Sequence, residues 1–209
     1  MSIHRHLFVL AAFLVAVSAG CSSQDPVGVR LTLDDSGAGT VSVAALSLPE
    51  ATVDLVDGSE KVKWDLHARL DVITGKFTSA DGLTIEDFQV NTARFGKDGG
   101  SMRLLLPCGK DARWFQSLHV ASEDRARLQD AMGYAIQEVE LHENITITVE
   151  IKGARVAGSL ISPVPRVAVT SKKATCTMVV PIDILESRRE PMNFVVNWEW
   201  PRPVGGDSN

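Results

Sequence analysis

Residues 145–152 read Ile-Thr-Ile-Thr-Val-Glu-Ile-Lys, and this stretch carries the pattern on which the fold depends. Aliphatic side chains occupy every odd position, and polar or charged side chains occupy every even position. A period of two places alternate side chains on opposite faces of a β-strand. The stretch therefore predicts a strand with one face in an apolar core and the other face in water.

The same alternation recurs along most of the chain and predicts a mostly β protein. Asp34-Asp35-Ser36-Gly37-Ala38-Gly39 separates two such runs and is rich in turn residues, which predicts a β-hairpin with a longer turn. The glycine-rich segment 96–100 predicts a second turn. The predicted strands include residues 27–33, 40–48, 62–72, 102–106, 145–151, 174–184 and 192–200.

One segment has helical periodicity instead. Ser122 is a good N-cap, and Glu123 and Asp124 follow it at the positive end of the helix dipole. Apolar residues then recur at helical spacing, which predicts a helix over residues 122–137 that packs on a sheet. The fold class predicted is α+β: a mostly antiparallel sheet with one amphipathic helix packed on it. The stripe consists of Leu128, Ala131, Met132, Ala135, Ile136 and Val139.

Composition excludes several classes of protein. The chain has 209 residues and a formal net charge of −5, without a basic cluster, which argues against nucleic acid as a partner. Its histidines show no metal-ligand spacing, and no cofactor motif occurs. No assembled set of catalytic residues is recognisable, so we expect a protein that is not an enzyme.

The N-terminus has the order of an export signal. Arg5 lies in a short positive leader, an apolar run extends from Leu7 to Val17, and Ser-Ala-Gly precedes Cys21. The run is too short to span a bilayer as a lone helix. This stretch resembles the signal peptide and lipobox of bacterial lipoproteins, which implies removal of residues 1–20 and acylation of Cys21. The alternative is an ordinary secretory signal with Cys21 unmodified.

The domain organisation follows from this resemblance. We expect a lipidated tether over residues 21–26, a single domain over residues 27–200 and a short disordered tail over residues 201–209. Ser22 follows the cysteine where an inner-membrane retention signal would have Asp. In a cell with two membranes, the resemblance therefore implies a lipid anchor in the outer membrane, on its periplasmic side.

Cys108 and Cys176 are the two remaining cysteines, and each shares its strand parity with apolar residues. In an exported protein an even number of leftover cysteines favours a disulfide. We predict a bond between Cys108 and Cys176. The alternative is two separate buried thiols that act as small hydrophobic groups.

The order of lipobox, hairpin, strands, helix and further strands resembles the β-rich domain of the LppM family of mycobacterial lipoproteins. The matching segments are residues 148–156, Thr-Val-Glu-Ile-Lys-Gly-Ala-Arg-Val, and residues 197–200, Asn-Trp-Glu-Trp. The resemblance implies a fold of sheet plus helix and an apolar cavity for a lipid or glycolipid. It implies no catalytic residue.

These features predict a lipid-anchored protein of the cell envelope with a binding or structural role. Its partners would be the membrane, through acylated Cys21, and an apolar or lipid ligand lying against curved strands. The alternative is an envelope hydrolase whose site is assembled from residues distant in sequence. Its candidate residues are Cys108 and the pair Asp34 and Asp35.

Overall fold

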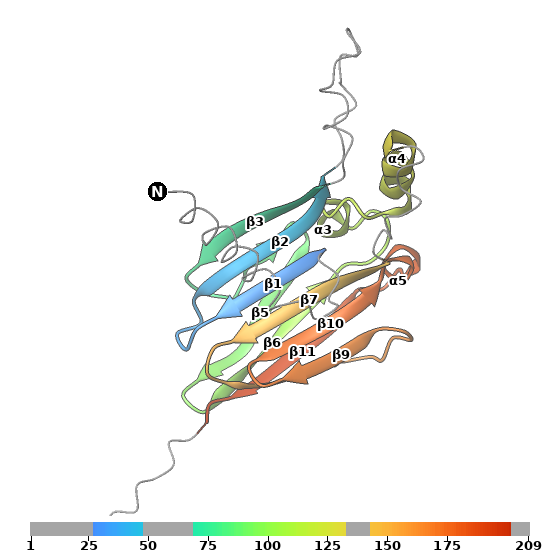
Figure 1. The fold of residues 1–209 in the computed structure, drawn as a ribbon. Helices are drawn as coiled ribbons and strands as arrows, with labels where there is room; N and C mark the ends of the chain where they lie inside the picture. Colours follow the sequence, from blue (N-terminus) through green and yellow to red (C-terminus); the bar gives the residue numbers. More distant parts are fainter. Residues whose placement is uncertain (1–26, 48–68, 133–142, 202–209) are drawn as a thin grey trace, which may run out of the picture.

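Two β-sheets face each other in the computed structural model, which describes residues 27–47, 69–132 and 143–201 (Figure 1). Sheet A contains β1 (Gly28–Leu33), β2 (Gly39–Ser47), β3 (Arg69–Phe77), β7 (Asn144–Ile151), β9 (Ala168–Lys172) and β10 (Thr175–Pro181). Sheet B contains β4 (Thr84–Ile85), β5 (Phe88–Gly96), β6 (Gly99–Leu106), β8 (Arg155–Leu160) and β11 (Met192–Glu199). The helices are α3 (Arg113–Gln116), α4 (Ser122–Met132) and α5 (Ile182–Ser187).

Strand order places β7 in the interior of sheet A. The six strands run in the order β3-β2-β1-β7-β10-β9, and the five strands of sheet B in the order β4-β5-β6-β11-β8. Strand β7 pairs in parallel with β1 and antiparallel with β10. The apolar face predicted for residues 145–151 is confirmed, because Ile145, Ile147, Val149 and Ile151 are all 0% exposed. The prediction that the opposite face lies in water is wrong, since Thr146 and Thr148 on that face are buried, at 7% and 6% exposed. Strands β1 and β2 also form the predicted antiparallel hairpin.

The core lies between the two sheets and is filled by side chains from both. Helix α3 adds Trp114 and Phe115 to it, and the ring of Trp114 packs against Phe88 with centroids 5.7 Å apart. Asp87 holds this helix in place, since its carboxylate accepts hydrogen bonds from the backbone N–H groups of Arg113 and Trp114. The largest fully buried side chains are Trp114, Phe88, Phe115, Phe194, Leu31, Leu33, Met102, Leu104, Leu106, Leu118 and Ile145.

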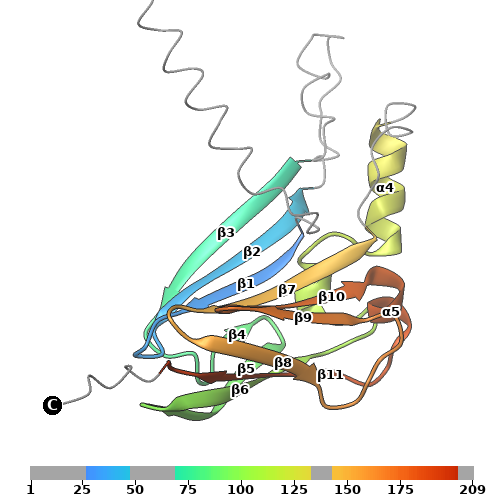
Figure 2. The same cartoon turned by 60° about the horizontal axis from the view of Figure 1, so that its bottom comes forward.

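The sheets lie close together along β8 and β9 and separate toward β3 (Figure 2). On the close side the backbone N–H of Val156 donates to the carbonyl of Lys173, and the N–H of Gly158 donates to the hydroxyl of Ser171. These bonds satisfy backbone groups on the outer edge of β8. On the wide side, the N–H of Leu46 in β2 bonds the carbonyl of Leu118, which follows α3.

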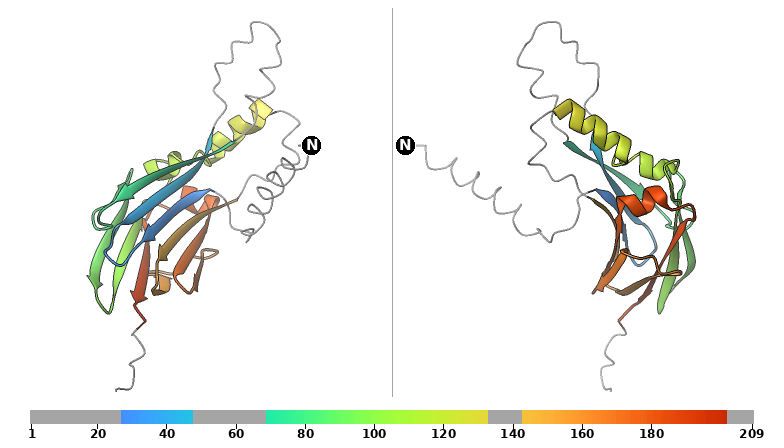
Figure 3. Two further views of the ribbon diagram at one scale, coloured as in Figure 1. Left: turned by 60° about the vertical axis from the view of Figure 1, so that its left-hand side comes forward. Right: turned by 90° about the vertical axis from the view of Figure 1, so that its right-hand side faces the viewer.

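The predicted fold class is wrong. In the described parts of the chain the structure is mostly β, with two sheets and three short helices, and not a sheet covered by a single helix. The predicted helix begins at Ser122 as expected, but α4 projects beyond the ends of the strands rather than lying across a sheet face (Figure 3). The reason is that each sheet supplies the apolar face that the other needs, so no helix is required to cover it. Residues 133–137 of the predicted helix lie outside the described residues.

Strand β3 differs from its prediction as well. It begins at Arg69, so most of the expected strand over residues 62–72 lies outside the described residues. Val72, predicted to face the core, is 59% exposed, and Ile73 on the opposite face is 73% exposed. Strand β3 is the outermost strand of sheet A, where sheet B no longer covers it.

The sandwich has two distinct ends. At the Gly28 end, β1 and β7 begin and β2 stops at Ser47. At the opposite end, named the Asp35 end, the turns after β1, β5 and β7 meet the last residues of β11. Among the described residues no helix combines the length and apolar character that crossing a bilayer requires.

Candidate functional site

A groove of about 730 Å³ lies at the Asp35 end. Three turns from different parts of the chain and the end of β11 form it. Its volume falls in the range of about 300–1,000 Å³ that is usual for small-molecule sites. The lining residues are Asp35, Phe95, Gly96, Lys97, Gly153, Trp200 and Pro201.

The β1–β2 turn forms one wall, and its conformation is set by Asp34. The Asp34 carboxylate accepts hydrogen bonds from the backbone N–H of Ser36 at 2.9 Å and from the Ser36 hydroxyl at 2.6 Å. These bonds, with the side-chain bond of Ser36 as the largest cause, lower the pKa of Asp34 below 3.8. The Asp34 carboxylate is therefore used in hydrogen bonds within the turn, whereas the next residue, Asp35, lines the groove.

Phe95 joins this turn to the core. A Cβ on Gly37 would lie 3.3 Å from the Phe95 ring, and Gly37 has a φ of +84°, so glycine suits this position on both counts. The other neighbour of the ring is Trp198, with centroids 5.3 Å apart. Phe95 is therefore held between the turn and the core of the sandwich.

Trp200 is fixed by the β5–β6 turn. Its indole Nε1–H donates to the carbonyl of Gly96 at 3.1 Å, and its backbone N–H donates to the carbonyl of Asp98 at 3.3 Å. The side chain is half-buried and lines the groove. These two bonds set the position of the indole.

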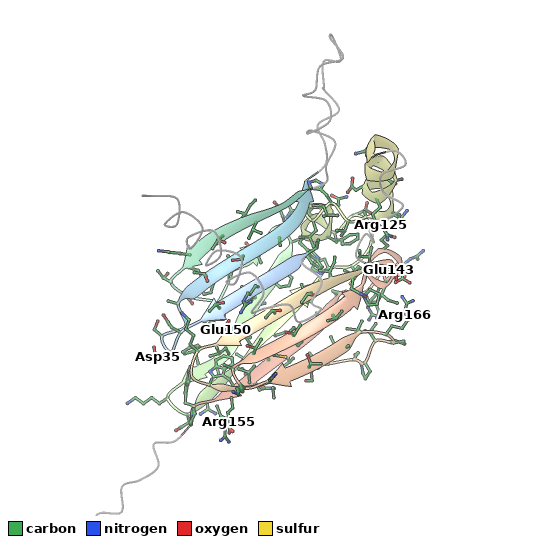
Figure 4. All side chains as sticks on the ribbon, viewed as in Figure 1. Asp35, Arg125, Glu143, Glu150, Arg155 and Arg166 are labelled. Carbon is green, nitrogen blue, oxygen red and sulfur yellow. The ribbon has the colours of Figure 1, made fainter. Side chains whose placement is uncertain are left out.

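Two charged side chains of opposite sign complete the groove. Asp35 and Lys97 are exposed, and within the described part of the chain neither makes a side-chain hydrogen bond or an ion pair. Figure 4 shows Asp35 at one end of the strands, with Arg125 and Arg166 at the other. The groove thus offers one anionic acceptor, one cationic donor and aromatic surface.

The structure does not form the predicted disulfide, because Cys108 and Cys176 are both free thiols. Cys176 lies against Gly158 in the middle of β8, whereas Cys108 follows the end of β6 at the Gly28 end. A strand rises about 3.3 Å per residue, so this offset exceeds the 4.4–6.8 Å usual between bonded Cα atoms. Both thiols do lie on the apolar side of their segments, since Cys176 is 0% exposed and Cys108 is half-buried.

Cys108 and Asp34, two of the candidate residues of the hydrolase alternative, have pKa values shifted in opposite directions. Burial raises the pKa of the Cys108 thiol above 9.0, although the Met192 backbone and Arg188 act in the opposite direction. A nucleophilic cysteine needs a lowered pKa. Asp34 has a lowered pKa, whereas a carboxyl acting as a general acid needs a raised one.

Within residues 27–47, 69–132 and 143–201, no group of three His, Cys, Asp or Glu side chains could hold a metal ion. Cys21, the predicted lipidation site, lies outside the described residues. No protein-family model, curated protein or solved structure matches the chain. The resemblance to LppM-like domains therefore stays a prediction.

Sequence reasoning identified the parts of the groove without identifying the groove. Residues 34–39 and 96–100 were both predicted as turns, and Trp200 was placed at the end of the last strand. Nothing local indicates that these segments meet, because they come together only through the pairing of distant strands and the packing of sheet A on sheet B. The charged residues within the turns, Asp35 and Lys97, were the available signal.

Proposed function

We propose that this protein is a non-enzymatic, lipid-anchored protein of the cell envelope that presents the groove at its Asp35 end to a ligand away from the membrane. The observation that carries the proposal is the position of the groove relative to the start of the domain. Gly28 and Asp35 lie at opposite ends of β1, and Cys21 precedes Gly28 by seven residues.

Chain lengths support this orientation. Seven extended residues span at most about 25 Å, so acylated Cys21 keeps the Gly28 end within that distance of the lipid surface. Strand β1 has six residues and adds roughly 20 Å toward the Asp35 end. Two acyl chains supply a stable anchor, since each buried methylene contributes about 0.8 kcal/mol.

The anchor is tested by labelling and fractionation. Cells expressing the protein take up a palmitate analogue into wild type and into Cys108→Ser, but not into Cys21→Ser. Cys21→Ser also leaves the membrane fraction, and inhibition of the lipoprotein signal peptidase leaves residues 1–20 attached. Retention of label by Cys21→Ser would overturn the proposed anchor.

The orientation is tested with a fluorophore at either end. In a Cys108→Ser, Cys176→Ala background, the acylated chain carries one label at Asn144→Cys or at Lys97→Cys. Vesicles containing a headgroup quencher are expected to quench the label at position 144 more strongly than the label at position 97. Equal or reversed quenching would contradict a groove that faces away from the membrane.

An apolar or lipid cargo is a second candidate, favoured by one row of residues on the inner face of sheet A. Val29, Val43 and Ile73 are neighbours across β1, β2 and β3. Val29 is 2% exposed, Val43 is half-buried and Ile73 is 73% exposed. Apolar surface therefore continues from the core to the open side of the sandwich. Native mass spectrometry of protein extracted from membranes tests this candidate, and an Ile73→Asp variant should carry less lipid than wild type.

A further inference from the structure

The groove at the Asp35 end combines three features that together define a class of ligand. Trp200 and Phe95 supply aromatic surface, and Trp200 is held in place by two hydrogen bonds to the β5–β6 turn. Asp35 and Lys97 supply an acceptor and a donor that have no partner within the described residues. Glycines at positions 96 and 153 leave space beside the backbone.

The two charges exclude a purely apolar occupant. Covering Asp35 and Lys97 with hydrocarbon would remove water from both groups without replacing its hydrogen bonds, which is costly. Because one group is acidic and the other basic, the groove has no net charge with which to select an anion or a cation. A neutral ligand with many hydroxyl groups satisfies both side chains, since a hydroxyl both donates and accepts.

The aromatic surface adds the second requirement. An indole held at its N–H edge packs best against another flat, apolar surface. A sugar ring has such a surface, formed by its C–H groups, and carries hydroxyls around its rim. The groove is bordered by turns and not by a free strand edge, so it offers no backbone ladder on which a peptide would align.

We propose that this groove binds a neutral carbohydrate, with Trp200 as the stacking surface and with Asp35 and Lys97 hydrogen-bonding the ring hydroxyls. This inference rests on the groove being the ligand site of the proposed function. Either an insoluble wall glycan or a soluble oligosaccharide could supply this chemistry, and the test distinguishes the two sources.

The experiment follows the indole N–H resonances of the full acylated chain in detergent micelles, with the Trp200 resonance assigned from a Trp200→Phe variant. Chitotriose represents amino-sugar wall glycans, maltotriose represents soluble glucans, and trialanine represents a peptide. We expect at least one trisaccharide to move the Trp200 resonance saturably, with Kd at or below about 1 mM. Preference for chitotriose indicates a wall glycan, and preference for maltotriose indicates a soluble one.

The groove can be narrowed at Gly96, where the backbone has room for a Cβ. A Cβ on Gly96 would meet only the Gly99 carbonyl oxygen, at an ordinary 3.7 Å. Gly96→Leu should therefore weaken trisaccharide binding at least about tenfold, and Asp35→Ala and Lys97→Ala should each weaken it as well. Ala168→Leu adds the same side chain to an exposed site on β9 and should leave binding unchanged.

Three results would overturn the inference. They are no shift with either trisaccharide, a shift with trialanine alone, and a trisaccharide shift that persists in Gly96→Leu. None of these results affects palmitate labelling or the quenching experiment, so failure of the carbohydrate proposal is separable from failure of the anchored orientation.

Discussion

A Cβ placed on Gly158 would lie 2.1 Å from the Sγ of Cys176, a distance that no real Cβ tolerates. Gly158 belongs to β8 in sheet B, and Cys176 belongs to β10 in sheet A. The absence of a side chain at position 158 is therefore what allows the two sheets to approach on their closed side. The Phe194 ring, 2.9 Å from the same Cβ, leaves no alternative space.

Gly158→Ala should lower the free energy of unfolding by about 1–3 kcal/mol, because the added methyl group overpacks this contact. Cys176→Ala removes the Sγ that the methyl group meets. The double variant should therefore lose less free energy of unfolding than the two single variants lose together, by about 1 kcal/mol. Urea denaturation of the three variants measures this coupling.

Gly75→Ala is the matched control, since a Cβ there would lie 3.6 Å from a methyl group of Val41, an ordinary contact. That variant should change stability by less than about 0.5 kcal/mol. Additive effects of Gly158→Ala and Cys176→Ala would contradict the direct contact.

Alkaline pH should destabilise the protein partly through its thiols. Burial raises the pKa of Cys176 and of Cys108 above the ordinary value of 9.0. Below pH 9.0 both thiols are protonated in the folded and unfolded states, so they make their full contribution to the stability of the fold. As pH rises above 9.0 toward the folded pKa, the unfolded chain loses these protons first, so stability falls. Urea denaturation at pH 7 and pH 10 should show a smaller loss for Cys176→Ala than for wild type, and an equal loss would contradict this origin.

Acid pH should affect the β1–β2 turn. The folded pKa of Asp34 lies below 3.8, so the turn is stabilised above that pH and loses this stabilisation as pH falls through the folded pKa. Ser36→Ala removes the hydroxyl that is the largest cause, and it should raise the Asp34 pKa toward 3.8. Carboxyl NMR titration measures the value. Ser36→Thr, which keeps a hydroxyl, should retain the low pKa, and a low pKa that survives Ser36→Ala would show that the hydroxyl is not its cause.

Strand β3 should tolerate a charged substitution on its inner face, whereas β1 should not. Ile73 is 73% exposed, so Ile73→Lys should alter the free energy of unfolding by less than about 0.5 kcal/mol. The lysine should also reduce self-association, because charge on an outer strand opposes pairing with another chain. Val29→Lys, at a site that is 2% exposed, should instead prevent stable folding. Urea midpoints and light scattering check both variants, and severe destabilisation by Ile73→Lys would show that this edge is covered in solution.

The side chains of a strand that face the core were predictable along much of the chain, because the alternation of apolar and polar residues is visible in the local sequence. In β11, the apolar positions Met192, Phe194, Val196 and Trp198 are all 5% exposed or less. At β3 the same reasoning placed Val72 on the core face and failed, because the strand register aligns Val72 with Ala44 on the outer face of sheet A and puts Ile73 on the inner face instead. The start of α4 at Ser122 was also local and was predicted, whereas its packing was not.

The candidate site was less predictable than the strands. Turn residues marked positions 34–39 and 96–100, yet the first turn belongs to sheet A and the second to sheet B, so they meet only because the two sheets pack together, with Gly37 against the Phe95 ring. Similarly, strand parity placed Cys108 and Cys176 on apolar faces without measuring the distance between them. A period of two specifies a face, and it carries no information about which strand lies alongside.

By itself, the sequence determined where most strands and turns form and which side chains point inward in most strands, although not in β3, because these properties depend mainly on neighbouring residues. Only the tertiary structure decided that the strands divide into two sheets, that Gly158 and Cys176 join them on one side, and that Asp35, Lys97 and Trp200 share a groove. The physical reason is that backbone pairing and side-chain packing between distant segments select these partners, and alternation constrains such selection only weakly.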